Sequence, residues 1–445
     1  MVEEGEKISL SISDLNHRGE GVGKCNHFTV FVPKAVPGDE ILVEITALHQ
    51  NFARANPLQW ITLSSQRTTP ACALHHSCGG CQLQHLNYPS QLLWKQKRLQ
   101  NTLKKIGNID IPVYPLLGMN YPYRYRNQAR IHLNYKGGNV NAGFYQENTH
   151  QIVNLEDCLI QHQNNIAVMI SLRQTLQELI DKAELKKRHY QYLPTSATIR
   201  TSFSSSRTVL SLEIPHHQTA RDIASTIAYQ IKNRTELLAG IVTCEKKGRS
   251  GIYQTVWGES ELKEILDELT FLFSPSSFFQ VNPLQAGQMY KKAAECAIRA
   301  NTAFDIYCGV GTLSLFLADK YLKVIGVESN PQAVESAVKN AQNNNKPNVH
   351  FLNAKAEKVF SSLIKEKTTK SMVVDPPRKG CSKGLLKTIT EAKPEGLVYI
   401  SCEPSTLARD LKYLNHMGYS PQVVYPIDMF PHTTHVESVV PIVPS

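Results

Sequence analysis

Residues 397–410, Leu397-Val398-Tyr399-Ile400-Ser401-Cys402-Glu403-Pro404-Ser405-Thr406-Leu407-Ala408-Arg409-Asp410, join an apolar run, a polar corner and a segment that suits a helix. This succession is typical of an open α/β sheet, in which ligands bind at the carboxyl ends of the strands. The residue presented at the corner is Cys402. Pro404 suits the first helical turn, and a helix N-terminus there would favour a thiolate, whereas the adjacent Glu403 would disfavour one. A cysteine at a strand end is by default a small buried hydrophobe, so this stretch alone does not assign a nucleophile.

A second strand signal leads into a glycine-rich turn. Residues 303–307 form an apolar run before Gly309-Val310-Gly311-Thr312, and the next strand ends in Glu328, about 20 residues after the turn. A carboxylate at that spacing binds ribose hydroxyls, and glycines let the backbone approach a cofactor. The turn lacks the third glycine of a dinucleotide site, which together with the acidic Asp305 favours S-adenosylmethionine (SAM) over NAD. Residues 272–445 are therefore predicted to form an α/β, Rossmann-like nucleoside-cofactor domain that uses Gly309, Gly311 and Thr312.

Two further acids lie at strand ends. Asp375 ends the strand 372–374, and the prolines that follow fix the exit of the backbone. Glu437 opens the last apolar strand. Glu437 alone would be a routine strand-edge acid, and only a pairing with Cys402 gives it a catalytic meaning. Asp375-Pro376-Pro377 also leaves open the methylation of an exocyclic base nitrogen, a reaction that needs no thiol.

The first 65 residues predict a small barrel. Strand-like runs cover 8–15, 28–32, 40–48 and 52–63, with turns at 19–23 and 36–39. Short strands with such turns suit a five-stranded barrel of the OB type, which is often an RNA-binding module. A packing module without a ligand is the alternative, and the turns alone do not decide between them.

A compact group of cysteines follows the barrel. Cys72, Cys78 and Cys81 share a glycine-rich loop, and Cys158 offers a distant fourth thiol. Three close thiolates and one remote thiolate suit a [4Fe–4S] cluster. Zinc is the alternative, although all-cysteine zinc sites are usually built from two short pairs.

Residues 66–271 predict an α+β central domain. They mix a strand signal at 208–214 with helix signals at 91–106, 164–183 and 219–232. The aromatic and arginine residues of 121–126 alternate, which suits either stacking on bases or an ordinary strand with one wet face.

Composition narrows the function classes. The chain has 445 residues, of which 42% are apolar, so two to four domains are expected. The acidic N-terminus has no apolar signal-peptide core, and no apolar run has the length of a membrane span, so a cytoplasmic protein is expected. A formal net charge of +10 points weakly to a polyanion such as nucleic acid.

Taken together, these motifs resemble the RNA uracil-C5 methyltransferase family, whose members make 5-methyluridine in ribosomal and transfer RNA. The likeness covers nearly the whole chain and begins with an N-terminal stretch similar to a TRAM domain. Its motifs, in chain order, are the four cysteines, Tyr125–Gln128, Ser277–Pro283, Asp305–Thr312, Glu328, Asp375–Arg378, Ser401–Asp410 and His435–Glu437.

The resemblance implies roles for individual residues. Cys402 would be the nucleophile and Glu437 the general base. The SAM pocket would be lined by Gln280, Tyr307, Glu328 and Asp375. The four cysteines would hold a [4Fe–4S] cluster, as in the members that act on 23S ribosomal RNA, whereas the bacterial transfer-RNA members lack both cluster and TRAM domain. Residues 91–124 would pack on the C-terminal domain.

The chain departs from the family pattern at one position. Members commonly have Asn-Pro after the nucleophile, and this chain has Glu403-Pro404. An acid at that position could raise the pKa of Cys402 or change how the uracil edge is held.

The expected protein is thus a monomeric RNA-binding enzyme with no obligate protein partner and no membrane association. Two alternatives stand beside methylation of 23S ribosomal RNA. One is uracil-C5 methylation of transfer RNA, and the other is a non-catalytic iron–sulfur RNA-binding factor.

Overall fold

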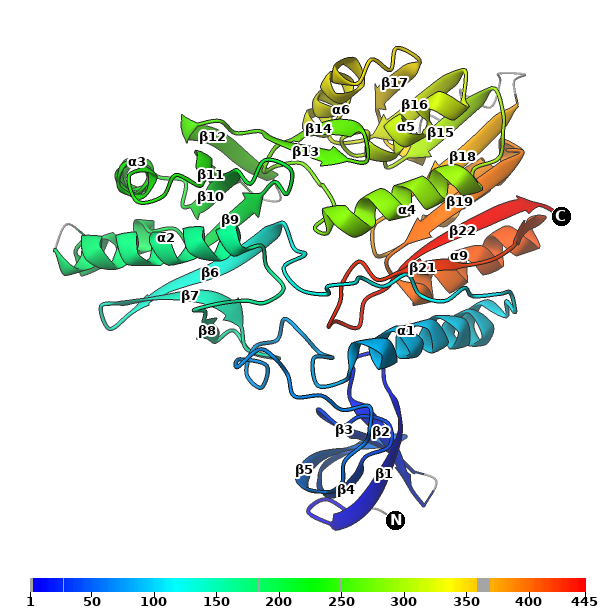
Figure 1. Cartoon of the computed structure of the whole chain (residues 1–445), viewed down its shortest axis with the longest axis horizontal. Helices are drawn as coiled ribbons and strands as arrows, with labels where there is room; N and C mark the ends of the chain where they lie inside the picture. The colour runs from blue at the N-terminus through cyan, green and yellow to red at the C-terminus, as the bar shows by residue number, and fades with distance from the viewer. Residues whose placement is uncertain (1–2, 27, 183–184, 248–249, 358–368) are drawn as a thin grey trace.

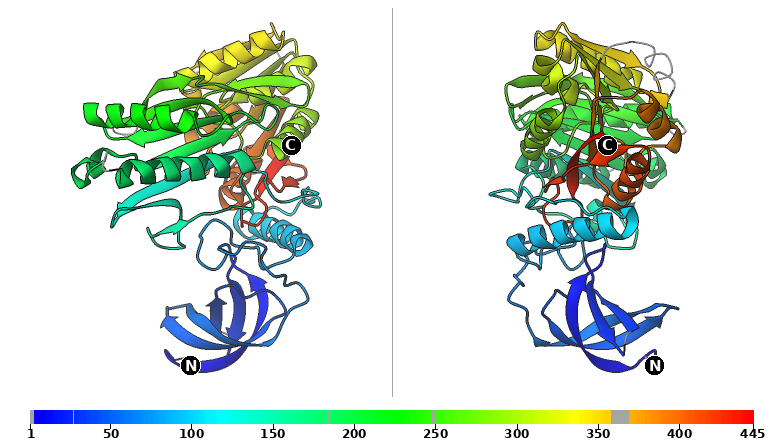
Figure 2. Two further views of the ribbon diagram at one scale, coloured as in Figure 1. Left: turned by 60° about the vertical axis from the view of Figure 1, so that its left-hand side comes forward. Right: turned by 90° about the vertical axis from the view of Figure 1, so that its right-hand side faces the viewer.

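The computed structural model describes residues 3–26, 28–182, 185–247, 250–357 and 369–445. In Figure 1 the N-terminal barrel lies below helix α1 (Tyr88–Thr102), with the central sheet to the left and the C-terminal sheet to the upper right. Both views in Figure 2 show α1 between the barrel and the C-terminal layers. In the described part of the chain no helix is both long and apolar enough to cross a membrane.

Within the described residues, the predicted five-stranded barrel is confirmed as a closed barrel in the order β1-β2-β3-β5-β4. One expectation was wrong, because residues from Gly21 onward form a strand instead of a turn. A Cβ at Gly21 would lie 2.6 Å from the Ala35 Cβ, and one at Gly23 would lie 2.5 Å from the Leu10 side chain. The glycines therefore allow close packing inside a narrow barrel. The strands are β1 (Lys7–Leu15), β2 (Gly21–Cys25), β3 (Phe28–Val32), β4 (Glu40–Leu48) and β5 (Phe52–Thr62).

The central segment is a mixed sheet in the order β12-β11-β10-β9-β6-β7-β8. Apolar side chains of its strands form a core with those of two amphipathic helices. The predicted helix end at residue 183 lies outside the described residues. The elements are β6 (Gln128–Lys136), β7 (Asn139–Tyr145), β8 (Ile152–Asn154), α2 (Gln163–Asp181), η2 (Lys187–Tyr192), β9 (Ser196–Thr201), β10 (Thr208–Ile214), α3 (Gln218–Lys232), β11 (Leu238–Lys247) and β12 (Ser250–Gly258).

The alternating segment 121–126 does not form the strand that was one of its two interpretations. Arg124 has φ +54°, which breaks an extended run, and β6 starts only at Gln128. The Arg124 guanidinium bonds both carboxylate oxygens of Asp157 at 2.7 and 2.6 Å and the Cys158 carbonyl at 2.9 Å. Tyr125 is fully buried. This segment therefore makes internal contacts that its composition did not reveal.

The C-terminal sheet has the order β17-β16-β15-β18-β19-β22-β20, with β21 paired to β22. Strands β15 to β19 run parallel, whereas β22 is antiparallel to β19. The carboxyl ends of the parallel strands and the start of β22 therefore meet at one edge. The elements are α4 (Pro283–Cys296), β15 (Thr302–Ile306), α5 (Thr312–Leu317), η3 (Ala318–Lys320), β16 (Lys323–Glu328), α6 (Pro331–Asn343), β17 (Val349–Asn353), β18 (Lys370–Val374), α8 (Lys383–Glu391), β19 (Gly396–Ser401), α9 (Pro404–His416), β20 (Tyr419–Pro421), β21 (Tyr425–Ile427) and β22 (Glu437–Pro444).

Two segments that begin before residue 272 pack into this C-terminal body. Helix α1, which begins at Tyr88 because the Asn87 side chain caps it, continues into the π-turn η1 (Leu103–Gly107). Leu99 and Leu103 share a core with side chains of α9. The hairpin of β13 (Leu262–Leu266) and β14 (Leu269–Phe273) packs into the core of the C-terminal sheet. The domain limits at 65/66 and 271/272 stay predictions.

Candidate active site

The register of β19 and β22 brings Cys402 beside Glu437. Ser401 pairs with Ser438, so the residue after one strand faces the first residue of the other. Cys402 is half-buried and Glu437 is 3% exposed. Burial, followed by the nearby carboxyls of Glu437 and Asp375, raises the pKa of the Cys402 thiol to about 12, while Arg378 acts in the opposite direction. The thiol thus needs an activating group before it can act as a nucleophile.

Burial affects both carboxyls of this edge. Burial raises the pKa of Glu437 well above its ordinary value, with Asp375 adding to the effect and Arg378 opposing it. Burial likewise raises the pKa of Asp375, at the end of β18, to about 7. A carboxyl whose pKa is about 7, like that of Asp375, can exchange protons near neutral pH. Arg378 is the cation of the group, and its Nη2 lies 2.8 Å from His435 Nδ1.

Glu403 was expected to act on Cys402, but its side chain contacts the first turn of α9. It is the N-cap of α9, and its Oε1 accepts hydrogen bonds from the Ser405 hydroxyl at 2.9 Å and the Ser405 N–H at 3.5 Å. Its charge also acts on Arg98 of α1. The carboxyls that raise the pKa of Cys402 most strongly are Glu437 and Asp375. Asparagine is also a good N-cap residue, so Glu403 occupies a capping position that asparagine could fill.

The glycine-rich turn and Glu328 are joined by hydrogen bonds. Glu328 Oε2 accepts from the Gly309 N–H at 3.3 Å, and Oε1 accepts from the Asn330 N–H at 2.7 Å. The backbone thereby fixes the orientation of the carboxylate at the end of β16. Gly311 has φ +81°, and a Cβ there would lie 2.7 Å from the Phe351 ring, so the turn requires glycine at this position. Thr312 begins α5 and is buried.

Tyr307 follows β15 and comes just before the glycine-rich turn. It has φ +68°, which is uncommon for a residue other than glycine and marks a constrained backbone. Burial raises its pKa above the ordinary value, and the surrounding charges of Cys381, Glu357, Asp410 and Glu328 act in the same direction.

Gln280 is buried next to Asn127 and to Tyr290, a residue that sequence reasoning missed. Its carbonyl accepts from Asn127 Nδ2 at 3.1 Å, and its side chain hydrogen-bonds the Tyr290 hydroxyl. Tyr290 is buried on α4, and its pKa is raised well above the ordinary value first by burial and next by Asp375. Asp305 is also buried: Oδ2 accepts from the Ser314 hydroxyl at 2.6 Å, whereas Oδ1 has no partner in the described structure. In the sequence, Tyr290 is a polar aromatic residue on the apolar face of α4, and this feature could have identified it.

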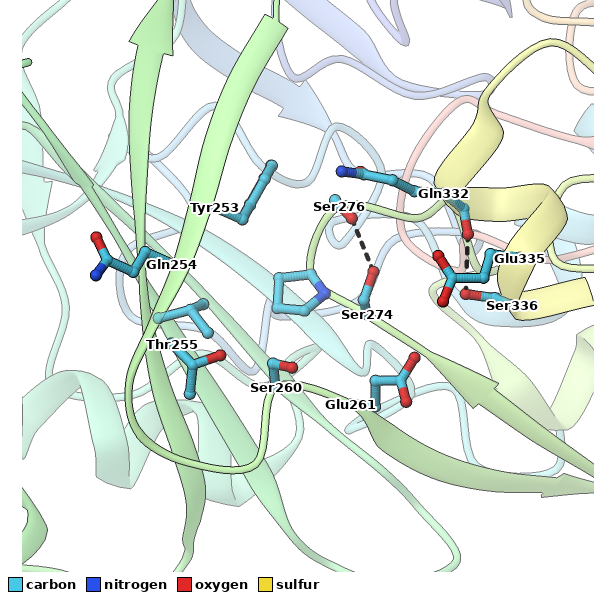
Figure 3. A pocket seen from close by; sticks show the side chains of 12 residues that line it. Tyr253, Gln254, Thr255, Ser260, Glu261, Ser274, Ser276, Gln332, Glu335 and Ser336 are labelled. Atoms are coloured by element: carbon cyan, nitrogen blue, oxygen red, sulfur yellow. Dashed lines mark hydrogen bonds between the residues drawn. The ribbon is translucent and has the colours of Figure 1, made fainter. Parts of the chain in front are cut away.

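A polar pocket lies between the central sheet and α6 (Figure 3). Its volume is about 190 Å³, and side chains of β12, the 274–276 loop and the first turns of α6 line it. The Ser274 and Ser276 hydroxyls lie 2.8 Å apart. The pocket contains none of the predicted site residues, although the 274–276 loop leads to Gln280 and α6 follows Glu328.

The structure brings Cys158 near the three cysteines of the loop, since Cys158, Cys78 and Cys72 all act on the pKa of Cys81. Burial is the main cause that raises the pKa of Cys81 to about 12 and of Cys158 to about 11, and the other thiols of the set add to it. The loop contacts β7, since the Gly79 N–H donates to the Tyr145 carbonyl at 3.1 Å. Within the described residues, no three His, Cys, Asp or Glu side chains converge closely enough to hold a metal ion. The thiols are thus neighbours but do not form a preformed single-ion site.

Comparison with known proteins agrees with this geometry. The tRNA (uracil-5-)-methyltransferase family profile matches residues 87–443, and the TRAM domain profile matches residues 1–58. The chain belongs to the tRNA (uracil-5-)-methyltransferase family. The predicted family membership, the TRAM domain and the assignment as an RNA methyltransferase are confirmed.

Relatives match over nearly the whole length. An uncharacterized RNA methyltransferase of Clostridium tetani is 37% identical over 99% of this chain and 96% of its own, and one of Bacillus cereus is 39% identical over 99% and 97%. Among solved structures, the Pyrococcus abyssi tRNA (uracil-54, C5)-methyltransferase in complex with S-adenosyl-L-homocysteine matches with a TM-score of 0.76 and 27% identity. It covers 98% of this chain and 99% of that chain.

Proposed function

We propose that this protein uses SAM to methylate C5 of a uracil in RNA through a covalent bond between Cys402 and the base. The observation that carries the proposal is the meeting of Cys402 and Glu437 at the sheet edge where Asp375 and the glycine-rich turn also lie. Methylation of an exocyclic nitrogen would need no thiol at this position.

The first step activates the base. Uracil C5 is too weak a nucleophile to attack a sulfonium methyl group unaided. The Cys402 thiolate adds to C6, and the electron pair of the C5=C6 bond moves into an enolate that makes C5 nucleophilic. The pKa of Cys402 is raised overall, and the Arg378 cation acts against this rise and so favours the thiolate. The target base must leave its stack to reach this edge.

The second step transfers the methyl group. C5 attacks the methyl carbon of SAM in line, and the methyl–sulfur bond breaks to leave S-adenosylhomocysteine. We assign the pocket for SAM to Gln280, Tyr307, Gly309, Gly311, Thr312, Glu328 and Asp375. The Glu328 carboxylate, which the Gly309 and Asn330 N–H groups orient, suits the ribose hydroxyls. Such positioning brings the reacting atoms into an attack geometry.

The third step restores the aromatic ring. Glu437 takes the C5 proton, the C–H electrons re-form the C5=C6 bond, and the C6–sulfur bond breaks to release the Cys402 thiolate. A carboxylate with a raised pKa is suited to accept a proton from carbon.

We further propose that Cys72, Cys78, Cys81 and Cys158 hold a [4Fe–4S] cluster. Four neighbouring thiols that raise each other's pKa form a donor set that positively charged iron would stabilise as thiolates. The cluster would tie the loop to residue 158 and take no part in methyl transfer.

We propose 23S ribosomal RNA as the substrate of a monomeric cytoplasmic enzyme, because the chain has both a TRAM domain and the four cysteines. Transfer RNA is the second candidate. The specific observation in its favour is the match to the Pyrococcus transfer-RNA enzyme along the whole chain.

The test is mass spectrometry of the protein after incubation with SAM and 23S ribosomal RNA that contains 5-fluorouridine. Fluorine at C5 cannot leave as a proton, so we expect a stable adduct on Cys402, and sequencing of the attached RNA identifies the uridine. A parallel reaction with transfer RNA separates the two substrates. Absence of an adduct with both RNAs, with SAM binding intact by calorimetry, would contradict the proposed chemistry. Lack of SAM binding would instead favour a non-catalytic RNA-binding factor.

A further inference from the structure

Residues 428–434 connect β21 to β22 and lead directly into Glu437. We call them the pre-β22 segment. Asp428 and Met429 have no exposed surface, and His432 is 3% exposed. His432 also has φ +66°, a left-handed conformation that costs a histidine free energy and persists only where its surroundings hold it.

Gln91 of α1 contacts both the backbone and the ring of His432. Its Oε1 accepts from the His432 N–H at 3.0 Å, and its Nε2 lies 3.2 Å from His432 Nδ1. The same Nε2 donates to the carbonyls of Leu83 and Leu86 at 3.0 and 2.8 Å. The Leu83 N–H in turn donates to the His432 carbonyl at 2.9 Å. One buried amide thus joins the pre-β22 segment to the chain that follows the cysteine loop.

Other contacts hold the rest of the segment. The Tyr123 ring stacks on His432 with centroids 4.6 Å apart, and the Tyr125 hydroxyl donates to the Pro431 carbonyl at 3.0 Å. Lys95 Nζ pairs with Asp428 Oδ1 at 2.6 Å in full burial. Arg98 Nη1 donates to the Thr434 carbonyl at 2.6 Å. These partners come from residues 83–125. At the start of the segment, Asn282 Nδ2 also donates to the Met429 carbonyl at 3.1 Å and Gln285 Nε2 to the Asp428 carbonyl at 3.4 Å. From His432 to Thr434, α1 and the segments beside it hold the chain that leads into β22.

Cys402 does not depend on these contacts in the same way. It follows β19, which pairs with β18 on one side and β22 on the other, and it precedes α9. Glu437 pairs with Ile427, the last residue of β21, and comes before the first pair of the β19–β22 ladder, Ser401 with Ser438. The pre-β22 segment lies within the loop that joins the two members of the Ile427–Glu437 pair. A looser pre-β22 segment would therefore move Glu437 more than Cys402.

We propose that Gln91 and His432 are positioning residues that place Glu437 for removal of the C5 proton. The inference rests on the proposed function. According to this inference, the contact between α1 and the pre-β22 segment controls the final elimination and not the formation of the adduct. Loss of the contact then leaves methylated RNA attached to Cys402.

The test compares Gln91→Leu with Gln96→Leu, a matched change on the same helix whose amide donates to Val113 at 3.0 Å and not to the pre-β22 segment. Single-turnover reactions with SAM and ordinary uridine RNA, of the kind that wild-type protein methylates, would follow adduct and released product separately. We expect Gln91→Leu to slow release about 10- to 100-fold, as for a misplaced catalytic group, while adduct formation changes less than about threefold. Gln96→Leu should behave like wild type.

His432 variants keep the test independent of any folding defect of Gln91→Leu. His432→Gly accepts the positive φ but removes the ring, so we expect methylated adduct to accumulate. His432→Asn also tolerates this φ and offers an amide to Gln91. Its rate of release should therefore stay within about threefold of the wild-type rate. Adduct formation and release that fall together in Gln91→Leu and His432→Gly, or that both stay unchanged, would overturn the proposal.

Glu437→Gln separates this inference from the proposed function. If that variant does not accumulate methylated adduct, the assignment of the base fails and the proposed function with it. If Glu437→Gln accumulates adduct and Gln91→Leu does not, only the positioning role of Gln91 and His432 fails.

Discussion

The thiols of Cys402 and of the four clustered cysteines are similarly buried, but different ionisable groups surround them. Burial raises the pKa of Cys402 and of Cys81 to about 12 in both places. Around Cys402 the other ionisable groups are two carboxyls with raised pKa values and the Arg378 cation. Around Cys81 they are mainly further thiols.

This difference separates a nucleophile from a ligand set. Carboxyls can exchange protons with a reacting base, and a cation can favour a thiolate, so the Cys402 environment supports chemistry on a bound substrate. Thiols alone cannot relieve one another's negative charge, so their group becomes favourable as thiolates only when a cation binds them. The two environments therefore predict opposite consequences for the same substitution.

Cys402→Ala should give the largest effect. We expect turnover to fall by about 10⁴-fold or more, because a residue that forms a covalent bond cannot be replaced by positioning alone. No adduct with 5-fluorouridine RNA should form. SAM affinity, measured by calorimetry, and iron content, measured by elemental analysis, should stay at wild-type values. A Cys402→Ser variant that retained activity would point to methylation of an exocyclic nitrogen.

Cys81→Ala should give the converse result. We expect most of the bound iron to be lost, because a cluster needs all four thiolates, with a lower melting temperature and a smaller fall in turnover than for Cys402→Ala. Cys25→Ala, in the barrel, is the matched control and should keep its iron. Wild-type protein purified without oxygen and found to hold zinc instead of iron would contradict the cluster assignment.

The sequence predicted those parts of the site that depend on local pattern. A strand, a turn and an acid are contiguous, so Glu328, Asp375 and Cys402 could be placed at one sheet edge before the structure was known. Antiparallel pairing then brought Glu437 to the same edge. The prediction of a turn at β2 was wrong, because the glycines of β2 allow close packing against Ala35 and Leu10 and do not form a turn.

The contacts that sequence reasoning missed join residues far apart in the chain. Gln91 and His432 are separated by 341 positions, and no motif marks either residue as part of the site. Tyr123 and Tyr125 belong to an alternating run whose composition suggested a strand or an RNA contact, yet they pack on His432 and Pro431. Only the tertiary fold reveals that residues 83–125 contact the pre-β22 segment.

Arg378→Gln removes the cation near Cys402 and so tests how far this cation distinguishes Cys402 from the clustered cysteines. Adduct formation requires the thiolate, so its rate should rise with pH in wild-type protein. Without Arg378 the pKa of Cys402 rises further, so the same rate should be reached only at higher pH. We expect a loss of about three- to tenfold at pH 7, equivalent to a shift of up to about one pH unit.

Stopped reactions with 5-fluorouridine RNA between pH 6 and 9 would measure this shift. Lys379→Gln removes the neighbouring exposed charge and is the control, since Lys379 is not among the main groups that shift the pKa of Cys402. A rate that falls equally at every pH would mean that Arg378 contacts the RNA instead of tuning the thiol.

Glu403→Asn should have the smallest effect, because Glu403 caps α9 and its charge acts on Arg98. Asparagine keeps the cap but loses a carboxylate at the helix N-terminus, so urea unfolding should show a loss of about 0.5 kcal/mol. Glu403→Ala also loses the cap and should lose about 1 kcal/mol. The pH dependence of adduct formation should stay unchanged in both variants. A shift of that dependence toward lower pH in Glu403→Asn would show that the acid beside Cys402 does suppress its thiolate, and the contrast with the clustered cysteines would then rest on three carboxyls and not two.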